Sequence, residues 1–394
     1  MNHSASPKMR MSRYKGKFEK GALPRVPHDV SEAKPASETK SGKKQKKSSG
    51  SVILRIVLVT LLIILLLAGA VLIYANHMLG KMNQEVYTGN SNVSIEDLVS
   101  DAVGTEGLVS AEEDTVEEIE KVWEQFEQIK DQPLMESEND IVNYLLIGSD
   151  RRDKTSYGNS DSMIVVSLNK STKKIHLTSL MRAIYVIMPE GSGHTDGMLN
   201  WAYAWGGPEL LVDTVETNFK IDIDHYITVD FSSFEQIVDA VGGVPITLTS
   251  GEANFINKFT ETTGAVAGSQ YLNGTQALAY ARCRSLDNDF KRTSRQRTVI
   301  EALIKTVGTL NLTQLNDLAN ALLPAISTDM SNTEIFAEVI NVPAYATYPI
   351  DQRMLPIENE AGNSYTGMIR KYGAEMYAID WSTNLPALEE FING

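Results

Sequence analysis

Short apolar runs separated by polar turns predict the strands of this chain. Runs rich in β-branched and aromatic residues lie at 143–147 (NYLLI), 163–168 (MIVVSL) and 173–180 (KKIHLTSL). The second and third runs are joined by a polar turn, which predicts an antiparallel hairpin. The other expected strands lie at 225–229, 345–350 and 354–357.

Helical periodicity predicts that helices alternate with these strands. Apolar residues recur at spacings of three and four in several segments. The expected helices lie at 112–130, 208–219, 231–241, 276–281, 293–310 and, with its proline in the first turn, 386–391. Because strands and helices are interleaved, with hairpins as well as crossovers, the fold class is expected to be α/β (α+β mixed). It would consist of a central mixed β-sheet with helices on both faces.

One apolar run is too long for an ordinary globular element. Residues 56–75 (IVLVTLLIILLLAGAVLIYA) contain no charge, and at about 1.5 Å per residue they match a bilayer core of about 30 Å. We predict a transmembrane helix over 52–76. Lysines precede the run and acidic residues dominate after it, so the N-terminus is expected in the cytoplasm and the C-terminal domain outside. A cleaved signal peptide is disfavoured, because the run begins about 50 residues into the chain.

The predicted organisation has four parts. They are a disordered basic cytoplasmic tail (1–50), the single membrane span (52–76), an extracytoplasmic stalk with one helix (77–139) and a catalytic domain (140–394) with its motifs in 140–310. The tail either binds anionic lipid headgroups or serves only to set the topology.

The charge distribution and the cysteine content exclude two classes of function. Residues 1–50 hold 13 of the 36 basic and 4 of the 50 acidic residues, which leaves −23 on the rest of the chain. Such an acidic bulk argues against a protein that coats nucleic acid. The single cysteine, Cys283, excludes an intramolecular disulfide framework and a cysteine-rich zinc site. It is expected to be a small core residue.

Two aspartates stand at the ends of neighbouring predicted strands. Asp150 follows the run at 143–147, and Asp161 precedes the run at 163–168. Carboxylates in such positions suit Mg²⁺, which prefers oxygen ligands. The alternative is that both residues only cap turns, as aspartate commonly does.

A basic segment reverses the charge of the acidic domain, with five arginines within residues 282–297. If 282–284 is extended, its two arginines share one face. Arg292 and Gln296 are four apart and share a helical face. Guanidinium groups near a helix start form a site for phosphate or pyrophosphate. The alternative is a solvated basic face that is neutralised by Asp287 and Asp289. The expected phosphate ligands are Arg182, Arg282, Arg284, Arg292 and Gln296.

Several separated motifs together resemble the LytR–CpsA–Psr family of cell-envelope proteins over roughly 140–310. In chain order they include GSDRR, NSDSMIVVSLN, SLMRAIYV, IDHYITVDFSSFEQIVDAVGGVPI, LNGTQALAYARCR and DFKRTSRQR. The resemblance implies a membrane-anchored, Mg²⁺-dependent phosphotransferase. It would move an anionic glycopolymer, either teichoic acid or capsular polysaccharide, from an undecaprenyl-pyrophosphate carrier to peptidoglycan through a phosphodiester bond. The implied partners are the polyprenyl-pyrophosphate-linked glycopolymer, peptidoglycan and membrane lipid, and no nucleic acid.

The resemblance also assigns roles to individual residues. It implies that Asp150 and Asp161 bind the metal and that they act in catalysis together with Arg182. It places the pyrophosphate on Arg182 and on the four other phosphate ligands named above. Asp161 and Asp150 are both candidates for the general base.

Two departures from the family pattern leave alternatives open. Asn159 stands where the family usually has arginine, and Ala183 stands where it usually has aspartate. A non-catalytic or weakly catalytic polyprenyl-pyrophosphate-binding protein of the same fold therefore remains an alternative, as does a polyprenyl-pyrophosphate hydrolase. Gene regulation is disfavoured, because the domain is acidic and the tail lacks a helix-turn-helix pattern.

Overall fold

The structure, a computed structural model, describes the C-terminal domain and parts of the segment before it. The described residues are 80, 93–103, 116–135, 140–150, 157–284, 286, 289–359, 362–363 and 365–394. The basic tail and the predicted membrane span lie outside them. Within these residues, no helix is both long enough and apolar enough to cross a bilayer.

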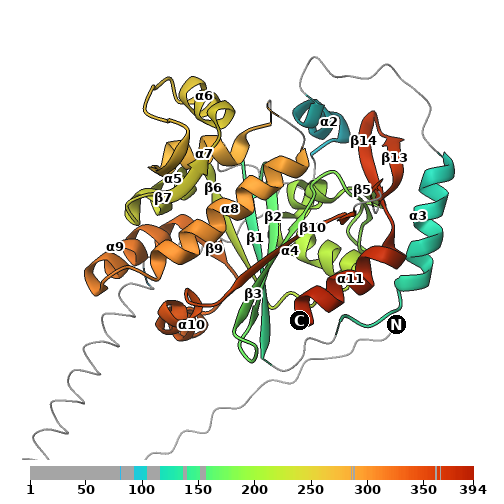
Figure 1. The fold of residues 1–394 in the computed structure, drawn as a ribbon. Helices are drawn as coiled ribbons and strands as arrows, with labels where there is room; N and C mark the ends of the chain where they lie inside the picture. The colour runs from blue at the N-terminus through green and yellow to red at the C-terminus, as the bar shows by residue number, and fades with distance from the viewer. Residues whose placement is uncertain are drawn as a thin grey trace, which may run out of the picture. The chain divides into compact units, whose positions relative to one another are not determined.

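A six-stranded mixed sheet forms the centre of the domain (Figure 1), which confirms the predicted architecture. The strand order is β10-β3-β2-β1-β6-β9. β1, β2 and β3 are antiparallel neighbours, whereas β6 is parallel to β1, and β10 is parallel to β3. The strands are β1 (Ile141–Ser149), β2 (Ser160–Asn169), β3 (Lys174–Leu180), β6 (His225–Asp230), β9 (Ile326–Thr328) and β10 (Ile350–Leu355).

Helices cover both faces of this sheet. On one face, Leu145 and Ile147 of β1 pack in a large core with α4 and α11, against which α3 also packs. On the other face, Tyr144 and Leu146 point toward α8. The helices are α2 (Ile95–Val103), α3 (Val116–Ile129), α4 (Leu199–Phe219), α5 (Phe231–Ala240), α6 (Ser250–Phe259), α7 (Gly274–Arg282), α8 (Asp289–Val307), α9 (Leu312–Leu322), α10 (Asn332–Tyr345) and α11 (Trp381–Asn393).

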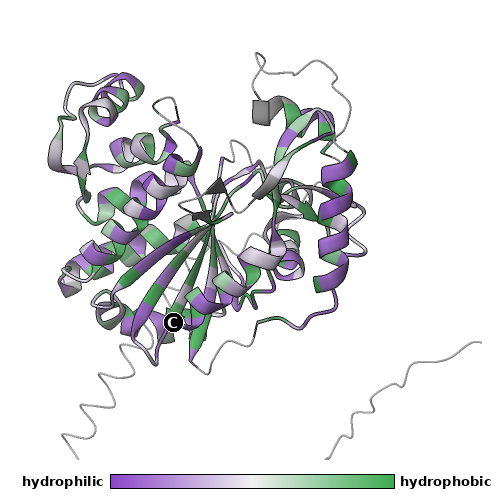
Figure 2. Cartoon of the chain, turned by 45° about the vertical axis from the view of Figure 1, so that its right-hand side comes forward, coloured by the Kyte–Doolittle hydropathy of each residue, from purple (hydrophilic) through white to green (hydrophobic). Residues whose placement is uncertain are grey.

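Four two-stranded sheets complete the described part of the domain. They are β4 (Tyr185–Ile187) with β5 (Asp196–Met198), β7 (Val244–Leu248) with β8 (Gly268–Leu272), β11 (Glu358–Asn359) with β12 (Gly362–Asn363), and β13 (Tyr365–Lys371) with β14 (Ala374–Ile379). In Figure 2 hydrophobic residues concentrate in the central strands, while α3 at the right is mostly hydrophilic. Its buried residues Val122, Phe126 and Ile129 form a narrow stripe against the core.

Two predicted elements near the C-terminus are wrong in part. The strand expected at 345–350 begins only at Ile350, and Tyr345 is the last residue of α10, a helix whose first turn is held by a capping box of Ser331 and Glu334. The last helix begins at Trp381, where the side chain of Asp380 caps the first turn. Pro386 therefore lies inside this helix and not in its first turn.

A kink in α4 is imposed by the backbone of one glycine. Gly207 has φ of 68° and ψ of −157°, which are not helical angles, and the helix continues on both sides of it. A Cβ atom at this position would lie 2.4 Å from Cζ of Tyr157. Glycine is thus required here both by the positive φ and by the close aromatic ring.

Candidate functional site

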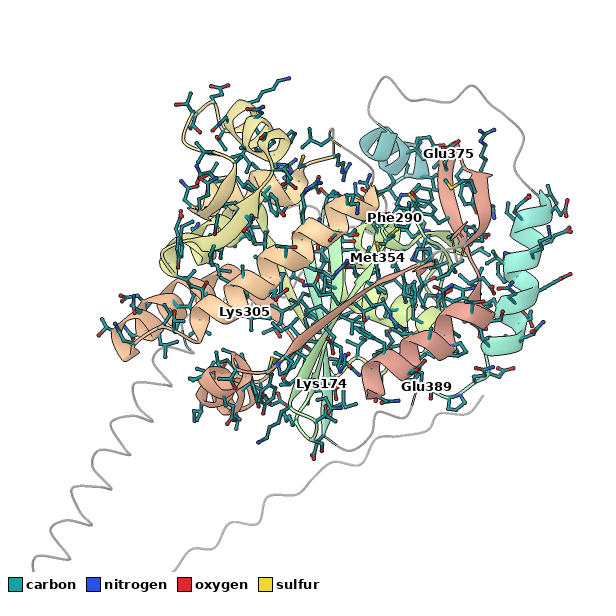
Figure 3. The ribbon with its side chains drawn as sticks, in the orientation of Figure 1. Lys174, Phe290, Lys305, Met354, Glu375 and Glu389 are labelled. Carbon is teal, nitrogen blue, oxygen red and sulfur yellow. The ribbon has the colours of Figure 1, made fainter. Side chains whose placement is uncertain are left out.

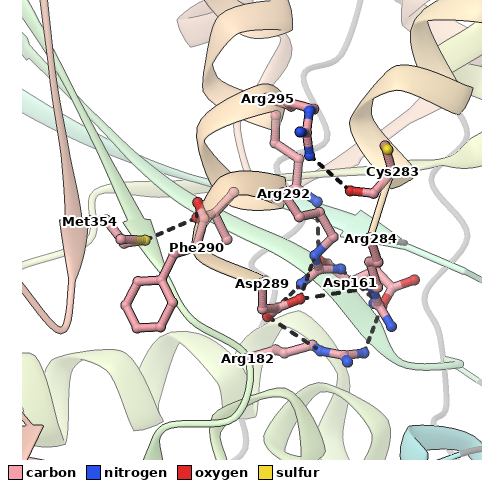
Figure 4. A network of polar contacts seen from close by, with 11 residues as sticks. Asp161, Arg182, Cys283, Arg284, Asp289, Phe290, Arg292, Arg295 and Met354 are labelled. Atoms are coloured by element: carbon pink, nitrogen blue, oxygen red, sulfur yellow. Dashed lines mark hydrogen bonds and ion pairs between the residues drawn. The ribbon is translucent and has the colours of Figure 1, made fainter. Parts of the chain in front are cut away.

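Three guanidinium groups meet one carboxylate where α8 begins (Figure 4). Arg182 follows β3, Arg284 follows α7, and Arg292 lies in the first turn of α8. A nitrogen of each group lies 3.3, 3.2 and 3.8 Å, respectively, from Oδ1 of Asp161, the second residue of β2. The structure therefore brings together four residues that the sequence placed in three separate segments.

A second carboxylate, that of Asp289, holds the same three arginines. Its Oδ1 lies 2.8 Å from Nε of Arg292, and its Oδ2 accepts a hydrogen bond from Nη2 at 3.1 Å. The same Oδ2 lies 3.8 Å from Nε of Arg182, and Oδ1 lies 3.8 Å from Nε of Arg284. Three cations share two anions, so the group carries one net positive charge. We call Asp161, Arg182, Arg284, Asp289 and Arg292 the arginine cluster.

Burial makes this concentration of positive charge unfavourable without a further anion. The Arg292 side chain is only 2% exposed. Its burial, together with repulsion from Arg284 and Arg182, lowers the pKa of Arg292 to about 10, although the two aspartates oppose the shift. Arg284 is more exposed, at 42%, and partial desolvation together with the neighbouring Arg182 lowers its pKa as well. Both groups remain cationic at neutral pH, so the cluster favours a ligand with several negative charges, such as a pyrophosphate.

Gln296 and Arg282 lie beside the arginine cluster. Gln296 is one turn beyond Arg292, and its Nε2 donates to the backbone carbonyl of Asp161 at 3.4 Å. The guanidinium carbon of Arg282 lies 4.5 Å from the ring centre of Phe231 and 5.5 Å from that of Phe259. Both Gln296 and Arg282 line the same cavity as the cluster.

Residues 282–284 are extended only in part. Arg282 is the last residue of α7, and the chain becomes extended at Cys283. A capping box of Asn273 and Gln276 satisfies the first turn of α7, and the helix ends where Cys283 takes up an extended conformation. Arg282 and Arg284 reach the cavity in spite of this difference, and Cys283 is fully buried, as expected.

Asp150 lies at the same opening and is held by Asn159. Its Oδ1 accepts a hydrogen bond from the backbone N–H of Asn159 at 2.9 Å, and its own N–H donates to the Asn159 carbonyl at 3.1 Å. Asp150 and Asp161 both line the cavity. No three His, Cys, Asp or Glu side chains in the described part of the chain gather as a metal site.

One cavity of about 710 Å³ extends from the arginine cluster between the sheet and α8. In Figure 3 the labels Phe290 and Lys305 mark the two ends of α8, which crosses the sheet. Beyond the charged opening the walls are almost entirely apolar. We call this part the apolar tunnel; its walls include Tyr144, Leu146, Ile164, Val166, Leu168, Ile227 and Val229 from the sheet and Val299, Ile300, Leu303, Ile304 and Val307 from α8.

The residues that line this tunnel could not be identified from the sequence. The apolar runs of β1 and β2 look the same whether they face a filled core or a hollow one. In the structure, the positions of β1 that face α4 are buried, whereas Tyr144 and Leu146 are only half-buried. Tyr144 and Leu146 are more exposed than their neighbours because the cavity lies beside them.

Comparison with known proteins identifies the family. A model of the LytR_cpsA_psr family matches residues 106–379, which is more than half of the chain. The chain belongs to the LytR_cpsA_psr family.

Curated relatives of this family member are transferases by name. The polyisoprenyl-teichoic acid–peptidoglycan teichoic acid transferase TagU of Enterococcus faecalis is 34% identical over 225 residues, which cover 55% of this chain and 71% of that protein. TagU of Halalkalibacterium halodurans is 35% identical over 198 residues, covering 49% and 62%. A solved chain of TagT bound to LI-WTA shares the fold, with a TM-score of 0.53 at 24% identity; the match covers 64% of this chain and 90% of that one.

The two departures from the LytR_cpsA_psr pattern have structural counterparts. Ala183 packs against the large core, and its carbonyl accepts a hydrogen bond from the N–H of Tyr377 at 2.7 Å. A carboxylate nevertheless stands beside Arg182, because Asp289 approaches it from α8. Asn159 contributes backbone hydrogen bonds to Asp150 and no positive charge. The arginine cluster is therefore assembled without the usual residues at 159 and 183.

A buried ion pair positions the segment that carries Arg282 and Arg284. Nε of Arg295, on α8, donates to Oε1 of Glu252 at 2.7 Å, and its Nη1 donates to the carbonyl of Cys283 at 3.1 Å. Glu252 belongs to the capping box at the start of α6. The pair thus links α6, α8 and the turn after α7. The sequence does not reveal this pair, since neither residue lies in a recognisable ligand spacing.

Proposed function

We propose that this protein transfers an anionic glycopolymer from a polyprenyl-pyrophosphate carrier to peptidoglycan. The observation that carries the proposal is one cavity that joins a cationic opening to an apolar tunnel. A ligand that satisfies both parts is an amphiphile with a polyanionic head and a hydrocarbon tail. The names of the curated relatives support teichoic acid as the polymer and peptidoglycan as the acceptor.

The arginine cluster would act on the pyrophosphate head. Phosphoryl transfer depends mainly on positioning and on neutralising charge, so an excess of guanidinium groups is the machinery it needs. Arg182, Arg284 and Arg292 would exchange part of their contact with Asp161 and Asp289 for phosphate oxygens. Gln296 and Arg282 would bind from the edge of the opening.

The reaction forms one phosphorus–oxygen bond and breaks another. A hydroxyl oxygen of the acceptor sugar attacks the phosphorus that bears the polymer, and the bond from this phosphorus to the bridging oxygen breaks. The products are a phosphodiester and polyprenyl phosphate. The hydroxyl proton passes to a carboxylate at the opening, for which Asp150 and Asp161 are the candidates.

Asp150 and Asp161 would also hold Mg²⁺ together with oxygens of the pyrophosphate. Two carboxylates at the edge of a phosphate site match the donor set that this ion prefers. When bound, it would withdraw charge from the pyrophosphate and so stabilise the leaving group. We further propose that the domain works on the outer face of the cell membrane, anchored by the span predicted over 52–76.

The test uses the full chain reconstituted in liposomes with a lipid-linked teichoic acid donor, peptidoglycan strands and Mg²⁺. Polymer covalently attached to the strands supports the proposal, and Arg284→Ala should abolish the attachment. Arg370→Ala is the matched control, because this arginine pairs with Glu375 across β13 and β14 and does not line the cavity. Polymer release without acceptor would instead indicate a hydrolase, and donor binding without turnover would indicate a binding protein.

A further inference from the structure

The end of the apolar tunnel opposite the arginine cluster carries a charged group. Among the cavity-lining residues, the charged ones are at the opening, with the exception of Glu338 on α10. Its Oε1 lies 2.9 Å from Nζ of Lys170, and its Oε2 accepts a hydrogen bond from the hydroxyl of Tyr345 at 2.9 Å. Nζ of Lys170 also lies 6.0 Å from the centre of the Tyr345 ring. We call Lys170, Glu338 and Tyr345 the floor cluster.

The position of the floor cluster follows from the strand that the tunnel runs along. Asp161 stands near the start of β2, and Lys170 directly follows its last residue, Asn169. The tunnel-lining residue Leu168 is seven residues beyond Asp161, so at about 3.3 Å per residue they are about 23 Å apart. Along α8, Arg292 and Val307 are fifteen residues apart, which gives about 22 Å at about 1.5 Å per residue. The two elements thus agree on the length of the tunnel.

The chemistry of the floor cluster opposes further entry of hydrocarbon. The side chains of Lys170 and Glu338 are 33% and 25% exposed, so the pair keeps part of its hydration. A hydrocarbon chain pushed against Glu338, the member of the pair that lines the cavity, would remove that water without replacing its hydrogen bonds, which is unfavourable. The tunnel walls before this point offer apolar contact at every step and favour entry.

We propose that the floor cluster limits the length of prenyl chain that the tunnel binds. This inference rests on the proposed function and adds a specificity to it: prenyl units contribute to affinity until the chain spans the tunnel. Further units lie outside the tunnel and add little. Tyr345 and Val342 close the same end from α10.

The experiment measures binding of prenyl pyrophosphates of increasing length to the full chain in phosphatidylcholine nanodiscs, with empty nanodiscs as the baseline. Geranyl, farnesyl, geranylgeranyl and undecaprenyl pyrophosphate form the series, and inorganic pyrophosphate reports the arginine cluster alone. Each prenyl unit within the tunnel should lower the dissociation constant by about tenfold or more, because it buries several carbons. Beyond the limiting length the gain per unit should fall below about threefold.

Two substitutions should move this limit in opposite directions. Glu338→Ala removes the carboxylate and opens space, so the limit should shift to a longer chain. Val342→Phe fills the end of the tunnel, so the limit should shift to a shorter chain. Glu117→Ala is the matched control, because this glutamate pairs with Lys121 at 2.8 Å on α3 and does not line the tunnel. All three variants should bind inorganic pyrophosphate as the wild type does.

The results separate this inference from the proposed function. If wild-type affinity rises with chain length but the limit is the same in Glu338→Ala and Val342→Phe, the floor cluster has no such role. The same conclusion follows if wild-type affinity rises without a limit up to undecaprenyl pyrophosphate. Affinity independent of the prenyl chain would instead overturn the proposed function. Should Glu338→Ala fail to fold, Val342→Phe decides the question alone.

Discussion

The buried pair of Glu252 and Arg295 provides the sharpest test of how the site is held in place. The two side chains are 11% and 9% exposed, and their polar atoms lie 2.7 Å apart. Breaking a buried ion pair by removing one partner costs about 3–5 kcal/mol, because the other charge stays buried. Glutamine keeps one acceptor oxygen, so we expect Glu252→Gln to lower the free energy of unfolding by about 2–4 kcal/mol. The melting temperature should fall by about 5–15 °C.

Thermal melting of the purified full chain measures the loss of stability. Calorimetric titration with inorganic pyrophosphate measures whether binding at the arginine cluster is weakened as well. Because Arg295 also donates to the carbonyl of Cys283, a loosened Arg295 should misplace Arg284 and weaken pyrophosphate binding about threefold to tenfold. Replacing both partners, as Glu252→Leu with Arg295→Met, should recover part of the stability without recovering the binding. Glu117→Gln, in an exposed pair, is the control and should change neither.

Two outcomes would contradict this reasoning in different ways. A melting temperature of Glu252→Gln equal to that of the wild type would show that the pair is not held as a buried ion pair. A lowered melting temperature with unchanged pyrophosphate affinity, measured well below the transition, would show that the pair stabilises the fold without positioning Arg284.

The difference in stability between the wild type and Glu252→Gln should depend on pH in a definite direction. Burial by itself would raise the pKa of Glu252, but the hydrogen bonds from Arg295 and Thr249 outweigh it and hold the pKa below 4.5. The folded state therefore binds the ionised form more strongly than the unfolded state does. This stabilisation is complete above pH 4.5 and is lost as the pH falls through the folded-state pKa. The wild type and Glu252→Gln should differ most near neutral pH and converge in acid.

Asp150, His176 and Gly207 each provide one further test. Asp150→Ala should remove the Mg²⁺ dependence of transfer in the liposome assay; a variant that responds to Mg²⁺ like the wild type would defeat the metal assignment. Burial lowers the pKa of His176, which packs against Phe391, so the stability of the wild type should fall as the pH drops below 6.5, whereas His176→Leu should show a flatter melting profile. Gly207→Ala should lower the free energy of unfolding, measured with urea, by roughly 2 kcal/mol or more, because of the positive φ and the ring of Tyr157.

Much of the fold could be predicted from local pattern. The hairpin of β2 and β3 and the helix α5 have strong periodicity and clear turn residues, and the structure has them nearly where the sequence places them. The errors lie at the ends of helices, where side-chain contacts within the helix decide its bounds. Tyr345 has a high strand propensity, yet it ends α10, where its hydroxyl donates to Glu338 two turns earlier. The first turn of α11 depends on Asp380, which is not distinguishable from an ordinary loop aspartate in the sequence.

The types of residue at the site were visible in the sequence, since arginines that interrupt an acidic domain are unusual and the family motifs mark them. Which of these residues form ion pairs with one another could not be read from the sequence. The sequence suggests Asp289 only as a neutralising surface charge, but it approaches Arg182, which precedes it by more than one hundred residues. Local sequence constrains which chemistry is available, because side-chain identity sets charge and hydrogen-bonding capacity. It does not specify which groups share a pocket, because that depends on how the strands order themselves and on where α8 crosses them.

The apolar tunnel most clearly separates what the sequence determines from what only the tertiary structure decides. Nearly continuous apolar runs along β1 and β2 require that both faces of the sheet be covered, and the sequence is sufficient to establish this. Whether a covered face is filled or hollow depends on how closely α8 approaches the sheet, and α8 is held by its contacts with α7, β7 and the strands β2, β3 and β10. Only the folded chain shows that Leu146 and Val166 border an open space, and that Glu338 lines the same space.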